Sequence, residues 1–211
     1  MTIRYIADTH WMHRNIVAYD NRPFSSMEEM DEAMTCLWNE TVKAEDVTYV
    51  VGDFCWSQTY EDWAAILSRL NGRVFIVKGN HDRSAILKRL TRNGLILGWS
   101  QQEIVKDGEN RVILNHSPMP FFINEHQENW AHLYGHVHIS YDWNMMLSMH
   151  RQIEELYLKK IRMYNVGCMI PYINYVPRTL NEIEDGFKKM DPLQLKFSQN
   201  HSWTKKQKKE D

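Results

Sequence analysis

The sequence lacks any long hydrophobic run. Nowhere in its 211 residues do about 18 apolar residues follow one another, so no membrane span is expected. Its N-terminal segment, MTIRYIADTH, also lacks the basic stretch, apolar run and cleavage site of a secretory signal. Cysteine is scarce, because only Cys36, Cys55 and Cys168 occur, without a CxxC pair. These absences predict a reduced, cytoplasmic protein with buried thiols and no membrane partner.

A strong charge of either sign is also missing. Lys and Arg number 25 and Asp and Glu number 27, so the formal net charge is only −2. Proteins that coat nucleic acid carry a basic field that releases counterions. No stable nucleic-acid partner is therefore expected, although a nucleotide or an oligonucleotide is compatible as a substrate. A chain of this length fills one core more readily than two.

Short β-branched and aromatic runs alternate with helical patterns, which predicts a layered α/β fold. The predicted strands are residues 3–7, 47–51, 74–77, 102–105, 112–114, 132–134 and 163–166. The turn at Asp107-Gly108 predicts a hairpin between the strands 102–105 and 112–114.

Helix signals lie between these strands. Helices are expected to begin at Ser26 and Thr179, where Glu29 and Glu182 complete capping boxes, and two others to end at Asn71-Gly72 and Asn93-Gly94. Residues 141–161 are predicted to form a helix inserted near the functional site. The whole domain is expected to span residues 1–190, followed by a polar, lysine-rich tail at 191–211.

Metal-capable side chains fall at the downstream ends of five predicted strands. They occur in the motifs Asp8-Thr9-His10, Gly52-Asp53, Gly79-Asn80-His81-Asp82, His116 and Gly135-His136-Val137-His138. Ligands bind outside the carboxyl ends of strands in open α/β sheets, so the five loops are expected to converge. Residues two apart in an extended chain project to the same side, so Asp8 with His10 is predicted to grip one ion. His136 and His138 have the same spacing.

The types of donor in these motifs restrict the metal. Carboxylate, imidazole and amide oxygen occur together, and no thiolate accompanies them. This mixture suits Mn, Fe, Zn or Ni better than calcium, which takes oxygen ligands, or a structural zinc held by cysteines. Among these metals Mn²⁺ is the expected ion, with Fe, Zn and Ni as alternatives.

With these motifs the sequence resembles the calcineurin-like metallophosphoesterases, whose pattern is DxH, GD, GNH[DE], an isolated His and GHxH. All five motifs are present over roughly residues 3–170. More loosely, His13, Arg22-Pro23-Phe24 and Asn165-Val166-Gly167 resemble small single-domain phosphodiesterase-like members of bacteria and phages.

The resemblance implies a four-layer α/β/β/α sandwich with a binuclear metal site at the carboxyl ends of the strands. The implied ligands are Asp8, His10 and His138 for one divalent ion, Asn80, His116 and His136 for the other, and Asp53 as the bridge. His81 would face the substrate and protonate the leaving group, with Asp82 orienting its ring. His13, Arg22 and Arg83 are candidates for binding phosphate oxygens, with surface or packing roles as the alternative.

The expected function is hydrolysis of a phosphodiester, such as a cyclic nucleotide or a small nucleotide-type diester, by metal-activated water. The second motif continues as GDFCWS and not as the GDxxDRG of Ser/Thr protein phosphatases, which disfavours that class. The alternatives are a phosphomonoesterase and a non-catalytic scaffold on the same fold. The complete ligand set favours catalysis. Trp11, Trp56 and Trp143 flank the motifs and either stack on a base or belong to the core.

Overall fold

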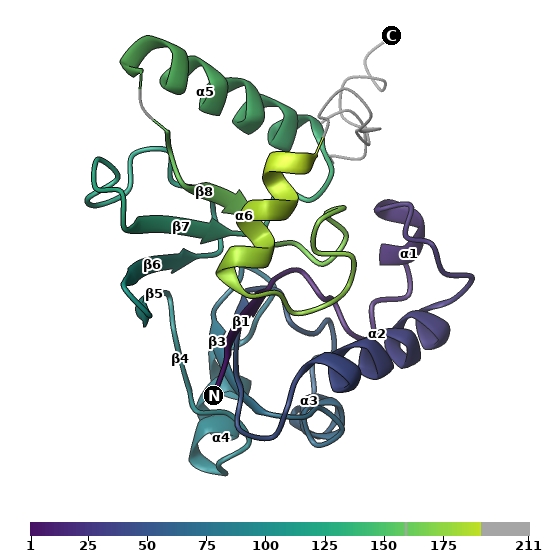
Figure 1. Ribbon diagram of the computed structural model, residues 1–211. Coiled ribbons are helices and arrows are strands. Elements are labelled where there is room, and N and C mark those ends of the chain that lie inside the picture. The colour runs from purple at the N-terminus through teal and green to yellow at the C-terminus, as the bar shows by residue number, and fades with distance from the viewer. Residues whose placement is uncertain (159, 191–211) are drawn as a thin grey trace, which may run out of the picture.

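The computed structural model describes residues 1–158 and 160–190, and these contain two four-stranded sheets (Figure 1). The first sheet is parallel, in the order β1 (Ile3–Ile6), β2 (Val47–Val51), β3 (Arg73–Val77) and β4 (Gly98–Ser100). The second has the order β5 (Gln102–Asp107), β6 (Asn110–Asn115), β7 (Trp130–Tyr134) and β8 (Met163–Asn165). Only its β5–β6 pair is antiparallel.

Helices cover the outer faces of both sheets, so the molecule has four layers (Figure 1). On the side of the first sheet lie α1 (Ile16–Tyr19), α2 (Met27–Thr41), α3 (Tyr60–Leu67) and α4 (Ser84–Arg92). On the side of the second lie α5 (Tyr141–Tyr157) and α6 (Leu180–Lys189). The predicted α/β/β/α sandwich is confirmed.

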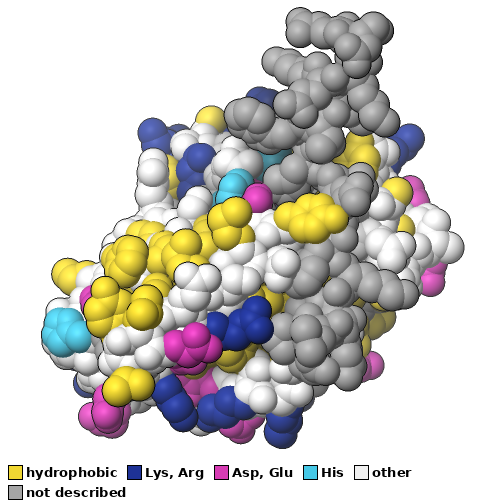
Figure 2. Space-filling model, turned by 90° about the horizontal axis from the view of Figure 1, so that it is seen from above, with side chains coloured by type: hydrophobic (Ala, Val, Ile, Leu, Met, Phe, Trp, Pro, Cys, Tyr) yellow, Lys and Arg dark blue, Asp and Glu magenta, His cyan; other side chains and the backbone are white. Residues whose placement is uncertain are grey.

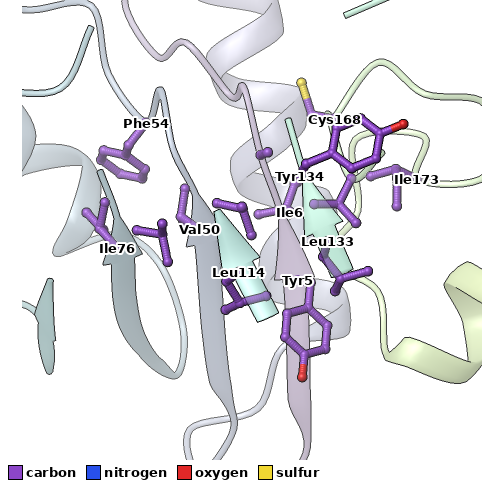
Figure 3. Packing of buried hydrophobic residues seen from close by; sticks show 14 of the residues in the cluster. Tyr5, Ile6, Val50, Phe54, Ile76, Leu114, Leu133, Tyr134, Cys168 and Ile173 are labelled. Atoms are coloured by element: carbon purple, nitrogen blue, oxygen red, sulfur yellow. The ribbon is translucent and has the colours of Figure 1, made fainter. Parts of the chain in front are cut away.

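The main core lies between the two sheets. Ile6 and Val50 from the first sheet and Leu114 and Leu133 from the second are fully buried and meet there (Figure 3). Strand β2, with the sequence VTYVV, is buried at four of its five positions. Such a continuous apolar run is typical of a parallel strand covered on both faces, here by helices and by the second sheet.

The two sheets are joined next to the end of β1. The Ala7 N–H donates to the Val166 carbonyl at 2.7 Å, and the Cys168 N–H donates back to the Ala7 carbonyl at 2.8 Å. Lower in the sandwich, the Tyr5 hydroxyl on β1 donates to the Asp107 carboxylate on β5 at 3.0 Å. The first strand is therefore fixed against the segment that follows β8, directly before the Asp8 motif.

The predicted strands all appear, and the hairpin between β5 and β6 is confirmed. Two short elements were not predicted, β4 and α1, because three or four residues are too few to show a hydrophobic period. Two helix ends were predicted too late. Helix α3 ends at Leu67 because residues 69 and 70 bond three positions back, and α5 ends at Tyr157 because Leu158 adopts a left-handed conformation.

The two predicted capping boxes differ in detail. At α6 both halves form, because Thr179 accepts from the Glu182 N–H and Glu182 accepts from the Thr179 N–H. At α2, Ser26 accepts from the Glu29 N–H, but the Glu29 carboxylate accepts from the Ser25 N–H and not from that of Ser26. The second half of that box was therefore predicted one residue too late.

The burial of the cysteines and of two tryptophans decides which of them belong to the core. Cys55 and Cys168 are buried, and burial raises the pKa of the Cys55 thiol to about 12, so it is a packing residue and not a reactive thiol. Cys36 is exposed, contrary to the expectation of buried thiols. Trp11 and Trp143 belong to the core. The predicted tail at 191–211 lies outside the described residues, so the domain division at residue 190 stays a prediction.

Helix α5 buries one face and exposes several apolar side chains on the other. Trp143 and Leu147 are buried, whereas Met145 and Leu156 are exposed, and hydrophobic side chains gather along this outer face (Figure 2).

In the described part of the chain, no helix combines the length and the apolar character that crossing a membrane requires.

Replacing Leu114 by alanine should lower the free energy of unfolding by about 2–5 kcal/mol, because the side chain is fully buried between the sheets. Urea denaturation of metal-free protein measures the difference. Ile104→Ala on the neighbouring strand is the matched control, since Ile104 is 45% exposed, and should cost less than about 1 kcal/mol. Equal costs at both positions would contradict the packing described between the sheets.

Candidate metal centre

Three side chains from distant motifs form the first potential ligand group. Asp8, His10 and His138 each place one ligand atom within 4.8 Å of the others. The Nε2 atoms of His10 and His138 are 3.4 Å apart, and His138 Nε2 is 3.7 Å from Asp8 Oδ1. The loop after β1 and the loop after β7 thus meet at the carboxyl ends of the two sheets.

A second potential group shares Asp8 with the first and adds Asp53 and His116. His116 Nε2 lies 3.2 Å from Asp53 Oδ2 and 3.0 Å from Asn80 Oδ1. His136 Nδ1 lies 3.0 Å from the same Asn80 oxygen. All seven predicted ligands are therefore brought to one place.

Asp53 occupies the middle of the cluster. Its Oδ2 atom is 3.8 Å from His10 Nε2 on one side and 3.2 Å from His116 Nε2 on the other. This position suits a bridging carboxylate, the role implied for Asp53. Asp8 also belongs to both groups, which the sequence did not indicate.

The expectation that the paired ligands lie in extended chain is wrong. Asp8 and His10 have φ of 53° and 51°, and His136 and His138 have φ of 71° and 45°, all in the left-handed region. Asp53 has φ of 52° as well. Such backbone is costly for residues other than glycine and persists where the surrounding structure enforces it, as it often does at functional sites. With this backbone, the His136 ring lies beside Asn80, whereas the His138 ring lies beside His10 and Asp8.

Two glycines make this close assembly of loops possible. A Cβ atom at Gly79 would lie 2.1 Å from Asp53 Oδ1, and one at Gly52 would lie 2.2 Å from His116 Nδ1. Gly52 also has φ of 90°, which other residues rarely adopt. The Asp53 and His116 side chains can occupy their positions only because these two residues have no side chain.

Asp20, whose side chain is only 8% exposed, belongs to the site although no motif indicated it. Its Oδ1 atom accepts from His138 Nδ1 at 2.7 Å, which directs His138 Nε2 toward Asp8 and His10. A carboxylate that holds the outer nitrogen of a histidine in this way is the usual support of a metal ligand. Asp20 lies outside every motif, in the turn after α1, so no spacing rule could have found it.

Of the two roles open to Arg22, phosphate binding and packing, the structure supports packing. Its side chain is fully buried, and its guanidinium donates to the Asp20 carboxylate and to the carbonyl oxygens of Thr9 and Asp8. These bonds hold the Asp8 loop and fix Asp20 beneath His138. Arg22 therefore supports the cluster from inside the protein and presents no donor to a substrate.

The predicted role of Asp82 also needs correction. Its carboxylate accepts three backbone N–H groups, from Asp53 at 3.0 Å, Phe54 at 3.0 Å and Gly79 at 2.8 Å. None of these bonds involves the His81 ring. Asp82 thus joins the loops after β2 and β3, and so sets the position of Asp53, instead of orienting His81.

His81 lies at the exposed side of the cluster. Its side chain is 43% exposed, its Nε2 atom is 4.0 Å from Asp53 Oδ2, and its backbone N–H donates to Asp53 Oδ1 at 2.9 Å. His13 is buried at the edge of the site, with its ring centroid 5.6 Å from that of His10. Arg83 is exposed directly before α4, and a contact with substrate stays a prediction for it and for His13.

The pKa values of two histidines, His116 and His138, reflect the negative charge of the carboxylates beside them. Burial alone would lower the pKa of His138, but Asp20 and Asp8 outweigh it and raise that pKa to about 10. Burial likewise opposes protonation of His116, yet the hydrogen bond to Asp53 and the charges of Asp8 and Asp53 raise its pKa to about 9. The carboxylates therefore favour the protonated rings of His116 and His138, whereas burial lowers the pKa of His10 to about 3.

This donor set fits divalent metal ions. Asp8 and Asp53 are buried carboxylates in mutual contact range, and buried charges require compensation. The buried guanidinium that reaches the Asp8 loop, Arg22, is already paired with Asp20. His116 Nδ1 faces the Val51 carbonyl at 2.9 Å and donates to it, so Nε2 is the nitrogen directed at Asp53 and Asn80. A cation bound between His116 Nε2, Asp53 Oδ2 and Asn80 Oδ1 would satisfy all three acceptor atoms.

Comparison with known proteins agrees with the chemistry of the cluster. The family model described as calcineurin-like phosphoesterase matches residues 1–97, which carry the first three motifs. Residues 1–97 are similar to the calcineurin-like phosphoesterases. The resemblance stated from the motifs is thereby confirmed, and the family implies divalent metal ions. The structure brings His116, His136 and His138, from outside the matched segment, into the same cluster of side chains.

Individual proteins are similar to this chain over most of its length. An uncharacterised protein of Methanocaldococcus jannaschii is 27% identical over 182 residues, 86% of this chain and 88% of that protein. A crystal structure of a protein of unknown function from Aquifex aeolicus matches with a TM-score of 0.59 and 22% identity, over 87% of this chain and 97% of the other. YfcE, a phosphoesterase from E. coli, matches with a TM-score of 0.35 and 14% identity, over 79% of this chain and 78% of that one.

Replacing Asp20 by asparagine should weaken binding of Mn²⁺ by about 10- to 100-fold, because His138 loses the carboxylate that orients it. The free energy of unfolding of metal-free protein should also fall, since Arg22 stays buried without its charged partner. Calorimetric titration with Mn²⁺ and urea denaturation measure the two effects.

Asp185→Asn is the control for this variant, because Asp185 forms an exposed pair with Lys188 on α6 and should change neither quantity. An Asp20→Asn protein with unchanged affinity for Mn²⁺ would show that the hydrogen bond to His138 does not support metal binding.

Proposed function

We propose that the protein is a phosphodiesterase that uses two divalent metal ions, with Mn²⁺ as the expected ion, to hydrolyse a small nucleotide-type diester. The observation that carries this proposal is the convergence of seven donor side chains, with Asp53 in the middle and His81 exposed beside them. Both potential ligand groups contain a carboxylate and at least one imidazole. The match of residues 1–97 to the calcineurin-like phosphoesterases supports the same chemistry.

In this proposal, one set of residues would bind the metal ions and another set keeps those residues in position. Asp8, His10 and His138 would hold one ion and Asn80, His116 and His136 the other, with Asp53 between them. Bound ions of this kind supply an activated water and neutralise charge on the phosphate. Asp82, Asp20 and Arg22 keep the loops and rings in position through buried hydrogen bonds.

His81 is the proposed proton donor to the leaving group. Its backbone N–H is fixed by Asp53 Oδ1, so the residue is held next to the cluster while its ring stays accessible. A positioned histidine that protonates a leaving alkoxide contributes roughly 10²- to 10⁴-fold to the rate.

The environment of the site favours a diester over a monoester. A monoester carries a second negative charge, which additional cationic side chains normally balance. Arg22 cannot do so, because its guanidinium is buried against Asp20 and backbone carbonyl oxygens. The segment after Asp53 continues with the apolar side chains of Phe54, Cys55 and Trp56 in place of an arginine.

Diesters should accordingly be hydrolysed in preference to monoesters. With Mn²⁺ present, kcat/KM for bis(p-nitrophenyl) phosphate should exceed that for p-nitrophenyl phosphate. Measuring both with one enzyme preparation tests the proposal. A tenfold preference for the monoester would overturn it in favour of a phosphomonoesterase, and no hydrolysis of either ester would favour a scaffold.

The role of His81 is tested by a variant that leaves the metal cluster intact. His81→Ala should retain its metal and lose about 10²- to 10⁴-fold in kcat on a diester with a ribose leaving group. The loss should be much smaller on bis(p-nitrophenyl) phosphate, because nitrophenolate departs without a proton. Metal analysis and kcat on both substrates are the measurements.

Asp53→Asn is the contrasting variant, since it should lose metal and activity on both substrates alike. Equal losses on both substrates for His81→Ala, together with lost metal, would instead place His81 among the ligands.

A further inference from the structure

One aromatic side chain at the site has no part in the roles assigned so far. Of the three tryptophans that flank the motifs, Trp11 and Trp143 are buried at 1% and 0% exposure, whereas Trp56 is 39% exposed. An exposed residue of this size keeps a large apolar surface in water, which is the kind of exposure that calls for an explanation. Core packing therefore accounts for two of the tryptophans and not for Trp56.

The ring of Trp56 lies on the open side of the metal cluster. Its centroid is 4.8 Å from that of His81 and 6.3 Å from that of His10. Asp8, Asp53 and His116 are buried, while Asn80, His81 and His136 are exposed, so a substrate reaches the cluster from the side of the exposed residues. Trp56 is next to His81 on that side.

Trp56 is also held in place. Its backbone N–H donates to the Trp11 carbonyl at 2.9 Å, and the adjoining Cys55 pairs with Trp11 in a parallel bridge. The ring packs on His13, with centroids 4.0 Å apart. A ring fixed in this manner loses little conformational freedom when a ligand stacks on it.

We propose that Trp56 is the stacking platform for a planar nucleobase on the leaving-group side of the substrate. This inference rests on the proposed function, since it assigns the part of a nucleotide-type diester that lies beyond the phosphate. A base can occupy this place while the phosphate lies over the cluster, because the same ring borders His81. Stacking tolerates any base, so the platform selects nucleotides as a class and not a particular sequence.

Binding of two phosphate compounds that differ only in the base tests the platform directly. Adenosine 5′-monophosphate and ribose 5-phosphate share the phosphate and the sugar, so the ratio of their dissociation constants reports the contribution of the base. Calorimetry on the Mn²⁺-loaded protein should give tighter binding of the nucleotide. Trp56→Ala should weaken nucleotide binding by roughly 5- to 100-fold and leave ribose 5-phosphate unchanged.

Two further variants separate stacking from packing. Trp56→Phe keeps an aromatic face and should retain most of the preference for the nucleotide. Tyr157→Ala removes another exposed aromatic ring, 71% exposed at the end of α5, and should change neither constant. If Trp56→Ala weakens both compounds equally, Trp56 merely packs on His13 and the platform is wrong.

The wild-type protein distinguishes failure of this inference from failure of the proposed function. Equal affinity for the nucleotide and ribose 5-phosphate, in an enzyme that hydrolyses bis(p-nitrophenyl) phosphate, overturns the platform alone. Absence of diester hydrolysis overturns the proposed function, and tight base-dependent binding at Trp56 would then still support the platform as a nucleotide-binding site.

Discussion

Two carboxylates buried at the ends of the first two strands impose the main constraint on this structure. Asp8 and Asp53 each place one carboxylate oxygen within 4.8 Å of the other and of His116, and both residues are almost completely buried. Charges in such surroundings are tolerated only with close compensation. The imidazoles of His116 and His138 supply it when they carry protons, and bound cations would supply it when they do not. The loops and glycines around them, together with the carboxylates of Asp20 and Asp82, hold this arrangement in place.

Asp20 and Asp82 support the cluster in two different ways. Asp20 acts on a ring, because its carboxylate accepts from His138 Nδ1. Asp82 acts on the backbone, because it accepts N–H groups from two different loops. Burial and the nearby charge of Asp53 raise the pKa of Asp82 to about 6, so it stands in unfavourable surroundings for an anion. The three N–H groups directed at its oxygens are what stabilise the charged form there.

Much of this could be predicted from the sequence because strand periodicity and motif spacing are local signals. The runs around Val50 and Leu114 predicted the strands, and the motifs at their ends predicted which side chains converge. The left-handed backbone at Asp8 and His138 could not be predicted, since it depends on contacts between loops distant in the chain. The same applies to Arg22. Its position after the first motif suggested a phosphate ligand, and only its burial against Asp20 showed otherwise.

The pairing of Ala7 with the segment after β8 has a consequence for the order in which the molecule assembles. Ala7 bonds to Val166 and Cys168, residues separated from it by most of the described chain. Contacts of such long sequence separation close late in folding, because the entropy of the intervening loop must be lost first. A nascent chain that has not yet emerged as far as Cys168 lacks the partner that fixes the end of β1. The cluster at Asp8 therefore lacks this support until the chain has been synthesised as far as Cys168.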